Sequence, residues 1–580
     1  MYHTDNHICQ DCRRNSSHPL SSCNNIFCQM TEASNPRTII TANRQIPGPP
    51  IQVCQNDILI VDVINRVPGK SVTLHWRGQP NHEAPFMDGV PMVTQCPIPS
   101  YTTFQYKFRA SKPGTHFYHA YMDADRSNGL FGALIVRKSD RTEPSKKMYD
   151  VDSKDHYILI SEWSDRDLSK ALLVNGKAPS ERGSSLTMFN VKPGRRHRFR
   201  VAYTSGLSGC PVNLTVDNHL LKIIELDGNP TNPHEVSSIR ISKGERIDFI
   251  LKASQEIGAY YLSVKYEPCQ VIILRTETPF ENSQRNDNFD TSSCESSDLH
   301  GLAVINYEGR PKGTEKKGGK IANDGGEKNT KLKRHFDTSL CRTESGKVCL
   351  GDVKSLDKMP KELRKETVDR NIFLAIDYKY GERETDYEQY ADLRKKIYRI
   401  NNLTFSYPAS PLLTQPMDVP SNLICNELSI PEKCQKRNIC ECVHLEAVDL
   451  GTSVEIMIVE QGAGGDDEHI LHFHGNHFYI VGSRQFERPM SRKEIRELDQ
   501  AGSLLKRNLN NPVLKDTIRI PRFGVVILRF LAKNPGIWML RDENSHGWSK
   551  GLDLAIEVGE RHQMVSTPSN FPTCGDYIGP

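Results

Sequence analysis

The sequence predicts an all-β fold built from three β-sandwich units, with a long polar segment between the second and the third. Short runs of β-branched and aromatic residues alternate with polar residues in three stretches, 36–140, 150–275 and 366–562, and Gly/Pro turn signals separate the runs. Few helices are indicated, and the best candidate is SRKEIRELDQAGSLLKR at 491–507. This texture is typical of antiparallel sandwiches, because a strand with one buried face alternates in this way.

The first unit shows the alternation most clearly. Its predicted strands are IQVCQNDILIVDVIN (51–65), YTTFQYKFRA (101–110), GTHFYHAYM (114–122) and GLFGALIVR (129–137). The turn signals RQIPGPP and SKPGT lie beside them. The second unit repeats the pattern in HYILISEWS, RRHRFRVAY, HLLKIIELDG, RIDFILKA and GAYYLSVKY, and the third in SVEIMIVEQ, HFYIVGS, DTIRIPRFGVVILRFLA and GLDLAIEVG.

Residues 276–365 differ from the rest, being polar, rich in Gly, Lys and Ser, and poor in aromatic residues. This composition predicts a mostly disordered linker. Residues 311–334 carry eight Lys/Arg and three Asp/Glu, whereas the whole chain has a net charge of only +4. The basic character therefore belongs to one segment and not to a folded face. Nucleic-acid or polyanion binding through it is a weak alternative, since such runs are usually solvated.

The 16 cysteines and three Asn-x-Ser/Thr sequons favour an extracellular protein with disulfides. The sequons are at Asn15, Asn213 and Asn402, and four cysteines lie in the N-terminal segment 1–35. A Cys9-x-x-Cys12 half-site for zinc is the alternative there. The first residues hold no apolar stretch, so a signal peptide is not present, and we expect the true first segment to be missing. No apolar run has the length of a membrane span.

HILHFHG, residues 469–475, predicts a metal site. On a strand His472 and His474 would point to one face, and pairs of imidazoles are the ligands of copper and zinc sites. Two further histidines stand in strand-like segments of the first unit, His75 in LHWRGQ and His119 in GTHFYHAY.

In order and spacing, these segments, together with NPVLKDTIRIPRFGVVILRF and NPGIWMLRDENSHGWSKGL, resemble the copper motifs of laccase-like multicopper oxidases, most closely those of arthropods. RQIPGPPIQVCQND and DGVPMVTQCPI fit the same family, and the resemblance covers most of the chain outside 276–365. It implies three cupredoxin-like, Greek-key β-sandwich domains, with copper in the third domain and between the first and the third. Residues 563–580 would form a C-terminal tail.

The resemblance also assigns eleven ligand positions, of which five keep their side chain. The blue copper site keeps only His469, the coupled copper pair keeps His119 and His474, and the remaining single-copper position keeps His75 and His472. Other residues stand at the lost ligand and axial positions, namely Arg77, Tyr121, Arg541, Asp542, Glu543, Gly547 and Leu552. His546 lies one place out of register.

These replacements predict an ion network in place of copper. Charges can be buried only when they are paired, so we expect Arg77, Arg541 and Glu543, together with Tyr121, to form a hydrogen-bonded salt-bridge network that fills the emptied cavity. Asp542 is expected to face the former blue site. His75, His119, His472 and His474 either hold one metal ion or remain as hydrogen-bonded relics. His469 is expected to be a satisfied polar residue.

The resemblance implies two further assignments. Asp88 matches an acidic residue that supports proton delivery in the family, although turn formation with Gly89 explains it equally well. Cys96 matches a cysteine that bridges to the tail, which implies a Cys96–Cys574 disulfide. The less specific alternative is two unpaired thiols.

Two functions follow. The first is a catalytically inactive, secreted member of the family, closest to the degenerate multicopper oxidase-related proteins, which binds an unidentified protein or small molecule and carries copper at reduced stoichiometry or none. The second is a residual copper-dependent oxidoreductase that acts on phenols or ferrous iron through a single copper.

Overall fold

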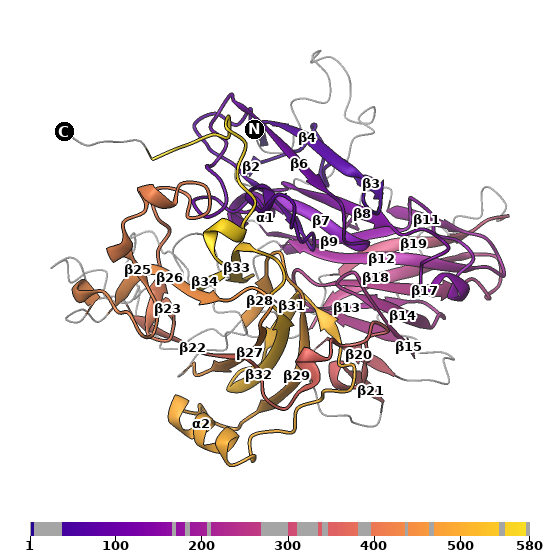
Figure 1. Ribbon diagram of the computed structural model, residues 1–580. Coiled ribbons are helices and arrows are strands. Elements are labelled where there is room, and N and C mark those ends of the chain that lie inside the picture. The colour runs from indigo at the N-terminus through magenta and orange to yellow at the C-terminus, as the bar shows by residue number, and fades with distance from the viewer. Residues whose placement is uncertain are drawn as a thin grey trace, which may run out of the picture.

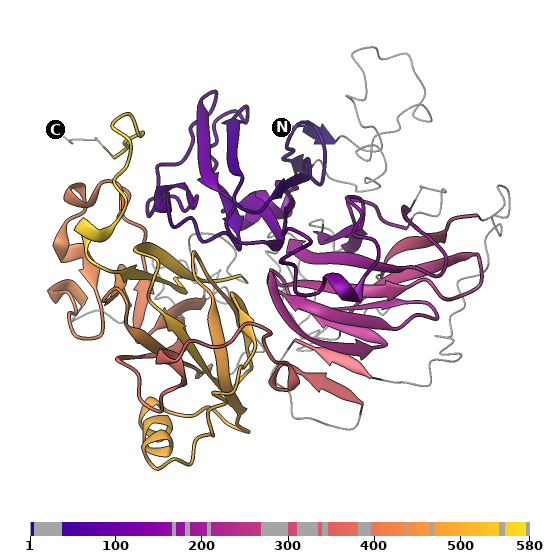
Figure 2. The same ribbon diagram turned by 45° about the vertical axis from the view of Figure 1, so that its right-hand side comes forward.

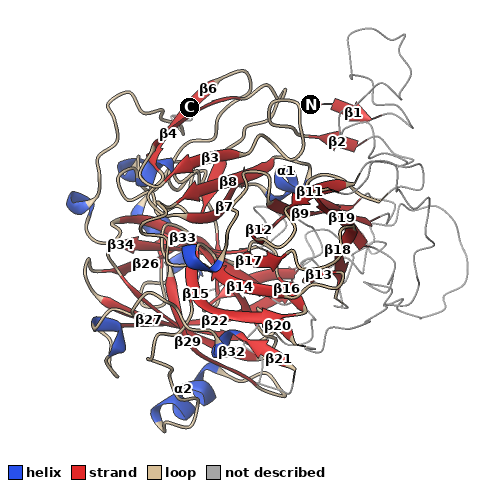
Figure 3. Cartoon of the chain, turned by 90° about the vertical axis from the view of Figure 1, so that its right-hand side faces the viewer, coloured by secondary structure: helices blue, strands red, loops and turns tan. Residues whose placement is uncertain are grey.

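The alternating segments form strands in a computed structural model of the protein, and the helices are few and short (Figure 3). The structure describes residues 2–4, 37–164, 170–179, 186–205, 210–267, 300–309, 334–338, 346–380, 396–434, 439–462, 469–543 and 551–575. Within these ranges the strands gather into three sandwich-like units, as the sequence predicts.

Domain 1 consists of a four-stranded sheet in the order β3-β8-β7-β5 and a β4-β6 pair. Its elements are β2 (Arg37–Ile39), which pairs with β1 (Tyr2–Thr4), β3 (Ile51–Cys54), β4 (Ile58–Ile64), β5 (Leu74–Arg77), β6 (Thr103–Arg109), β7 (Gly114–Ala120), α1 (Asp123–Ser127) and β8 (Phe131–Arg137). In β6 the alternation places Phe104, Tyr106 and Phe108 inward against Trp76, so the predicted period of two holds.

Domain 2 has a six-stranded sheet, β10-β9-β12-β17-β14-β15, facing a seven-stranded sheet, β11-β19-β18-β13-β16-β20-β21. The strands are β9 (Tyr157–Ser164), β10 (Lys170–Val174), β11 (Thr187–Val191), β12 (Arg196–Ser205), β13 (Val212–Val216), β14 (Leu221–Leu226), β15 (Asn229–Val236), β16 (Ser238–Ile241), β17 (Arg246–Lys252), β18 (Ala259–Tyr266), β19 (His300–Tyr307), β20 (His335–Asp337) and β21 (Lys347–Cys349).

The prediction of a continuous linker over 276–365 is wrong for part of that range. Strand β19 lies inside the domain 2 sheet, parallel to β11 and antiparallel to β18, and β20 and β21 extend the same sheet. The physical reason is visible in HGLAVINY, whose alternate residues are buried along β19. Averaging over a polar window concealed this short amphipathic strand. The basic residues 311–333 lie outside the described ranges.

Domain 3 is one 13-stranded sheet, in which twelve strands follow one hydrogen-bonded path and β25 pairs with β26 beside it. Its elements are β22 (Arg370–Tyr380), β23 (Lys396–Ile400), β24 (Leu403–Phe405), β25 (Ile424–Cys425), β26 (Cys440–Val448), β27 (Ser453–Glu460), β28 (His469–Phe473), β29 (Phe478–Gln485), α2 (Arg492–Gln500), β30 (Leu514–Lys515), β31 (Thr517–Ile520), β32 (Gly524–Leu531), β33 (Gly536–Asp542) and β34 (Asp553–Val558). The predicted helix is α2, which Ser491 and Glu494 cap reciprocally at its start.

The three domains meet around a common centre. Domain 1 lies at the top of Figure 1, domain 2 on the right and domain 3 at the lower left, and the yellow C-terminal segment runs up beside domain 1. Figure 2 separates the three units and shows the same tail next to the first of them. Among the residues that the structure describes, no helix combines the length and the apolar character that crossing a membrane requires.

Candidate metal centre

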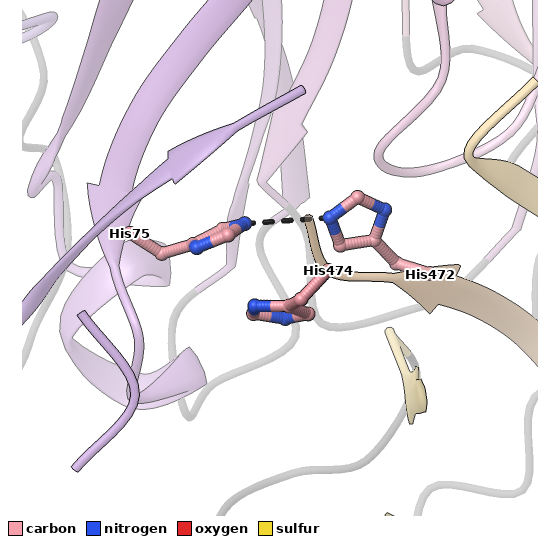
Figure 4. A group of neighbouring side chains, drawn as sticks. All are labelled: His75, His472 and His474. Atoms are coloured by element: carbon pink, nitrogen blue, oxygen red, sulfur yellow. Dashed lines mark hydrogen bonds between the residues drawn. The ribbon is translucent and has the colours of Figure 1, made fainter. Parts of the chain in front are cut away.

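Three histidines from two domains converge at this centre. His75 lies on β5 of domain 1, while His472 lies on β28 of domain 3 and His474 directly follows that strand. Figure 4 shows the three rings pointing toward one another. One ligand atom from each lies within 4.8 Å of the others, and all three side chains are buried. The face shared by His472 and His474 is the one that their spacing predicts.

The outer nitrogens of these rings are held by oxygen acceptors. Nδ1 of His75 lies 2.8 Å from the Asp88 carbonyl oxygen, Nδ1 of His474 lies 2.8 Å from Asp88 Oδ2, and Nδ1 of His472 lies 3.0 Å from the Asp516 carbonyl oxygen. A carbonyl or carboxylate oxygen can only accept, so each Nδ1 carries the proton. In a neutral imidazole this leaves Nε2 as a bare acceptor.

The Nε2 atoms of His75 and His472 are 3.3 Å apart. Two bare acceptors at this distance repel each other unless a proton or a metal ion lies between them. Two imidazole ligands of a tetrahedral metal are separated by about 3.3 Å when each metal–nitrogen bond is about 2.0 Å long. Nε2 of His75 and Nε2 of His472 therefore have the spacing of two ligands of one metal ion, and a ligand atom of His474 lies within 4.8 Å of both residues' ligand atoms. Asp88 contacts the rings of His75 and His474 on the far side, as groups that orient metal-binding histidines do.

His119 lies beside this group but is not part of it. It pairs with His75 across β5 and β7, and the ring centroids are 5.4 Å apart. Its Nδ1 lies 2.7 Å from the Ala120 carbonyl oxygen, and its buried Nε2 has no hydrogen-bond partner among the residues that the structure describes. The predicted four-histidine set is therefore a three-histidine group with a neighbour.

Burial favours the neutral form of His119, His472 and His474. Burial and the adjacent His75 lower the pKa of His474 to about 4. Burial lowers the pKa of His472 and His119 well below the usual range, with Arg77 and Arg126 respectively as the next cause. Burial alone would raise the pKa of Asp88, but His474 and His75 hold that pKa below its ordinary value. Neutral imidazoles beside a carboxylate are suited to a cation.

An ion cluster lies next to the histidines. Arg77 Nη1 donates to Glu543 Oε1 at 2.7 Å, and Arg126 Nη1 donates to Glu543 Oε2 at 2.5 Å. Lys243 of domain 2 donates to the Glu543 carbonyl oxygen at 2.6 Å. Burial raises the pKa of Glu543, but the two guanidiniums outweigh it and hold that pKa well below its usual range. The Arg77–Glu543 pair is as predicted.

Sequence reasoning missed Arg126 and Lys243. Neither residue stands in a copper motif. The only available signal was the charge balance of the predicted network, in which one carboxylate, Glu543, faces two guanidiniums. Arg541 contacts Tyr121, which is another member of the predicted network. Its Nη1 donates to the Tyr121 carbonyl oxygen at 2.6 Å, and its guanidinium carbon lies 4.1 Å from the centre of the Tyr121 ring.

The place that the resemblance assigns to the blue copper holds a histidine–carboxylate pair. His469 Nδ1 lies 3.0 Å from Asp542 Oδ2, and the Ile470 amide donates to Asp542 Oδ1 at 3.0 Å. Asp542 thus faces this position as predicted, and His469 is a satisfied polar residue. Leu552, at the axial position, is buried in the hydrophobic core. Gly547 and His546 lie outside the described residues.

The structure contains the disulfide between Cys96 and Cys574, which joins positions 478 residues apart and ties domain 1 to the tail. Two more disulfides, Cys425–Cys442 and Cys434–Cys440, lie in domain 3. Of the sequons, Asn402 occupies an exposed turn and Asn213 is half-buried on β13, whereas Asn15 lies outside the described residues.

Comparisons with known proteins agree on the family. Three family models, each described as multicopper oxidase, match residues 27–141, 145–282 and 408–562. Laccase-9 of Arabidopsis thaliana is 27% identical over 586 residues, covering 94% of this chain and 90% of that protein. Laccase-3 of Trametes villosa is 32% identical over 239 residues, covering 39% of this chain and 49% of that protein.

Solved structures show the same fold. Fet3p, a multicopper oxidase that functions in iron import, superposes with a TM-score of 0.65 at 17% identity, covering 92% of this chain and 90% of that chain. The laccase of Botrytis aclada gives 0.62 at 20% identity, covering 92% and 86%. The three units are thus cupredoxin-like domains, and the chain belongs to the multicopper oxidase family.

Proposed function

We propose that this protein does not reduce O₂ through four coppers and acts instead as a secreted binding or interaction protein. The observation that carries the proposal is the Arg77–Glu543–Arg126 ion cluster, in which Arg77 and Glu543 occupy positions that the resemblance assigns to ligands of the coupled copper pair. Guanidinium groups stay protonated and cannot act as ligands, and two of them repel a Cu²⁺ ion. In this proposal, paired charged side chains occupy the place where the family holds the coupled copper ions and supply positive charge there.

The blue-site position supports the same proposal. Reduction of O₂ to water takes four electrons, which must enter and be stored. A blue copper needs two histidines and a thiolate, whereas here His469 pairs with the hard oxygen of Asp542. With neither a thiolate nor a coupled pair, the chain has neither an entry point nor a store for those electrons.

A second candidate is a residual copper-dependent oxidoreductase, and the three-histidine group favours it. A single copper ion would supply a one-electron redox couple. His75, His472 and His474 would hold the ion, and Asp88 would fix two of the rings. Phenols or ferrous iron would be the substrates of such slow chemistry.

Copper content and turnover separate the two candidates. Purified protein is incubated with excess Cu²⁺, dialysed, and measured by metal mass spectrometry and by oxidation of a phenol and of ferrous iron. The proposal expects at most one copper per chain and no turnover. His472→Ala should abolish the copper that binds, and His82→Ala, an exposed histidine, should not. Four coppers with turnover would overturn the proposal, and one copper with turnover would establish the second candidate.

We further propose that the protein is extracellular. The part of the chain that the structure describes contains three disulfides, which are typical of an oxidising compartment. Glycans are then expected at Asn402, in its exposed turn, and at Asn213 and Asn15. The replaced ligand positions favour a place among the degenerate multicopper oxidase-related proteins of arthropods, which the motifs resemble. The partner is an unidentified protein or small molecule.

A further inference from the structure

A turn of domain 2, residues 242–246 between β16 and β17, reaches the centre where the domains meet. Its charged residues Lys243, Glu245 and Arg246 are all buried. Its Gly244 carbonyl oxygen accepts from Arg77 Nε of domain 1 at 2.9 Å. Gly244 has a φ of +85°, and a Cβ there would lie 2.4 Å from Arg77 Nη2. Glycine is therefore required for this close approach.

The turn meets domain 3 through two reciprocal ion pairs. Lys515 and Asp516 of domain 3 face Glu245 and Arg246 of domain 2, so each charge meets its opposite. Lys515 Nζ lies 3.1 Å from Glu245 Oε1 and 2.9 Å from Asp227 Oδ2. Both terminal nitrogens of Arg246 donate to the Asp516 carboxylate, Nη1 to Oδ1 at 2.6 Å and Nη2 to Oδ2 at 2.5 Å. Bidentate pairing of this kind fixes orientation as well as distance.

Asp516 belongs to the histidine group as well. Its carbonyl oxygen accepts from His472 Nδ1 at 3.0 Å, and its Oδ1 lies 3.5 Å from the same nitrogen. Lys515 is the adjacent residue in the same contact, and among the residues that the structure describes it forms ion pairs with Asp227 and Glu245. The two ion pairs of this interface therefore differ in their neighbours. The Asp516–Arg246 pair contacts the ring of His472, whereas Lys515 pairs with Asp227 and Glu245.

We propose that Arg246 of domain 2, acting through Asp516, is a positioning residue for His472, so that metal occupancy of the histidine group and docking of domain 2 on domain 3 stabilise each other. This inference rests on the single-metal site described under Proposed function. The described part of domain 2 supplies no residue to the histidine group, yet the Arg246 guanidinium fixes Asp516, which orients Nε2 of His472 toward Nε2 of His75. By linkage, a ligand that prefers the docked state also strengthens docking.

The test compares variants of the Asp516–Arg246 pair with a variant of Lys515, all in the full chain. Zn²⁺ and Cu²⁺ affinities are measured by calorimetry, and unfolding midpoints are measured with and without metal. Arg246→Lys keeps the positive charge and loses the bidentate hydrogen bonds to Asp516. Asp516→Asn removes the negative charge with which Arg246 pairs. Loss of a residue that orients a metal ligand typically costs 10- to 100-fold in affinity. We expect a weakening of that order in both variants, and a smaller rise of the unfolding midpoint on adding metal.

Lys515→Met is the matched control. It should lower the metal-free unfolding midpoint, because it removes the lysine that pairs with Glu245 and leaves Asp227 with Arg246 alone of its two described cations. It should leave metal affinity within about twofold of wild type. Equal losses of affinity in Lys515→Met and Arg246→Lys would overturn the proposal, since general docking would then explain both. Wild-type affinity in folded Arg246→Lys would overturn it as well.

A wild-type protein that binds neither ion would instead contradict the single-metal site. The positioning role is then decided by the tautomer of His472, read from long-range ¹H–¹⁵N spectra of histidine-labelled protein. Wild type should carry the proton on Nδ1, and Arg246→Lys should show a mixture of tautomers or a mobile ring. An unchanged, rigid Nδ1–H tautomer in the variant would overturn the proposal.

Discussion

Arg77 and Glu543 form a buried ion pair 2.7 Å long, although 466 residues separate them in the chain. Their side chains are 0% and 3% exposed. The pair joins domain 1 to domain 3 at positions where the resemblance places copper ligands, and it is closed by Arg126 and Lys243. In the family, copper would link domain 1 to domain 3 at these positions. Here an ion pair between side chains of the two domains makes this link.

Glu543→Gln should destabilise the protein strongly. The variant leaves two buried guanidiniums with a neutral partner, and breaking a buried ion pair typically costs about 3–5 kcal/mol. Urea unfolding measures the change. Glu83→Gln is the control, because its pair with Arg109 is exposed and such pairs contribute less than about 1 kcal/mol. Equal effects of the two variants would show that the cluster does not hold the domains together.

Asp542→Cys alone should not create a blue copper site. The new thiolate would face His469, but Gly547 supplies no second imidazole, and a blue site needs two histidines with the cysteine. Absorption and electron paramagnetic resonance after copper addition measure the outcome. The double variant Asp542→Cys/Gly547→His should gain blue absorption if the scaffold still has the right shape. An intense blue colour in the single variant would contradict this account of the site.

Metal-free protein should lose stability as the pH falls from about 6.5 toward 4. The pKa of His474 is about 4 in the folded protein, against about 6.5 in the unfolded chain. Between these values the unfolded chain binds a proton that the folded protein excludes, so the free energy of unfolding falls with the pH. His474 alone contributes a loss of about 2 kcal/mol at pH 5, and the lowered pKa values of His119 and His472 act in the same direction.

Urea midpoints at pH 7.5 and pH 5, with a chelator present, test this dependence. His562→Gln, at a histidine whose side chain is 73% exposed, should leave the slope unchanged. A midpoint that stays constant over this range would contradict the prediction, because it would mean that the folded and the unfolded protein bind the same number of protons between pH 7.5 and pH 5.

Cys574→Ser should lower the unfolding midpoint. The Cys96–Cys574 bridge closes a loop of several hundred residues, and removing a native disulfide typically costs about 2–5 kcal/mol. Cys54→Ser is the control, because Cys54 is exposed and is the free cysteine among the residues that the structure describes. A tail that contributes nothing to stability would show as identical midpoints for the two variants.

The sequence by itself determined the three β-sandwich units, the helix α2 and the shared face of His472 and His474. These features follow from the periods of two and 3.6 residues, which report which face of an element is buried. The sequence did not reveal β19, because a short alternating strand inside a long polar window carries little weight against the average composition. Family motifs, rather than periodicity, located His75 and implied the Cys96–Cys574 bridge.

Only the tertiary structure decided which other charges meet the Arg77–Glu543 pair and its surroundings. Arg126, Lys243 and Arg246 stand in no motif, and their partners lie hundreds of residues away in the chain. The structure also separated His119 from the other three histidines. Periodicity fixes the face on which a side chain lies, whereas the packing of three domains around one centre fixes its neighbour, and electrostatic pairing depends on the neighbour.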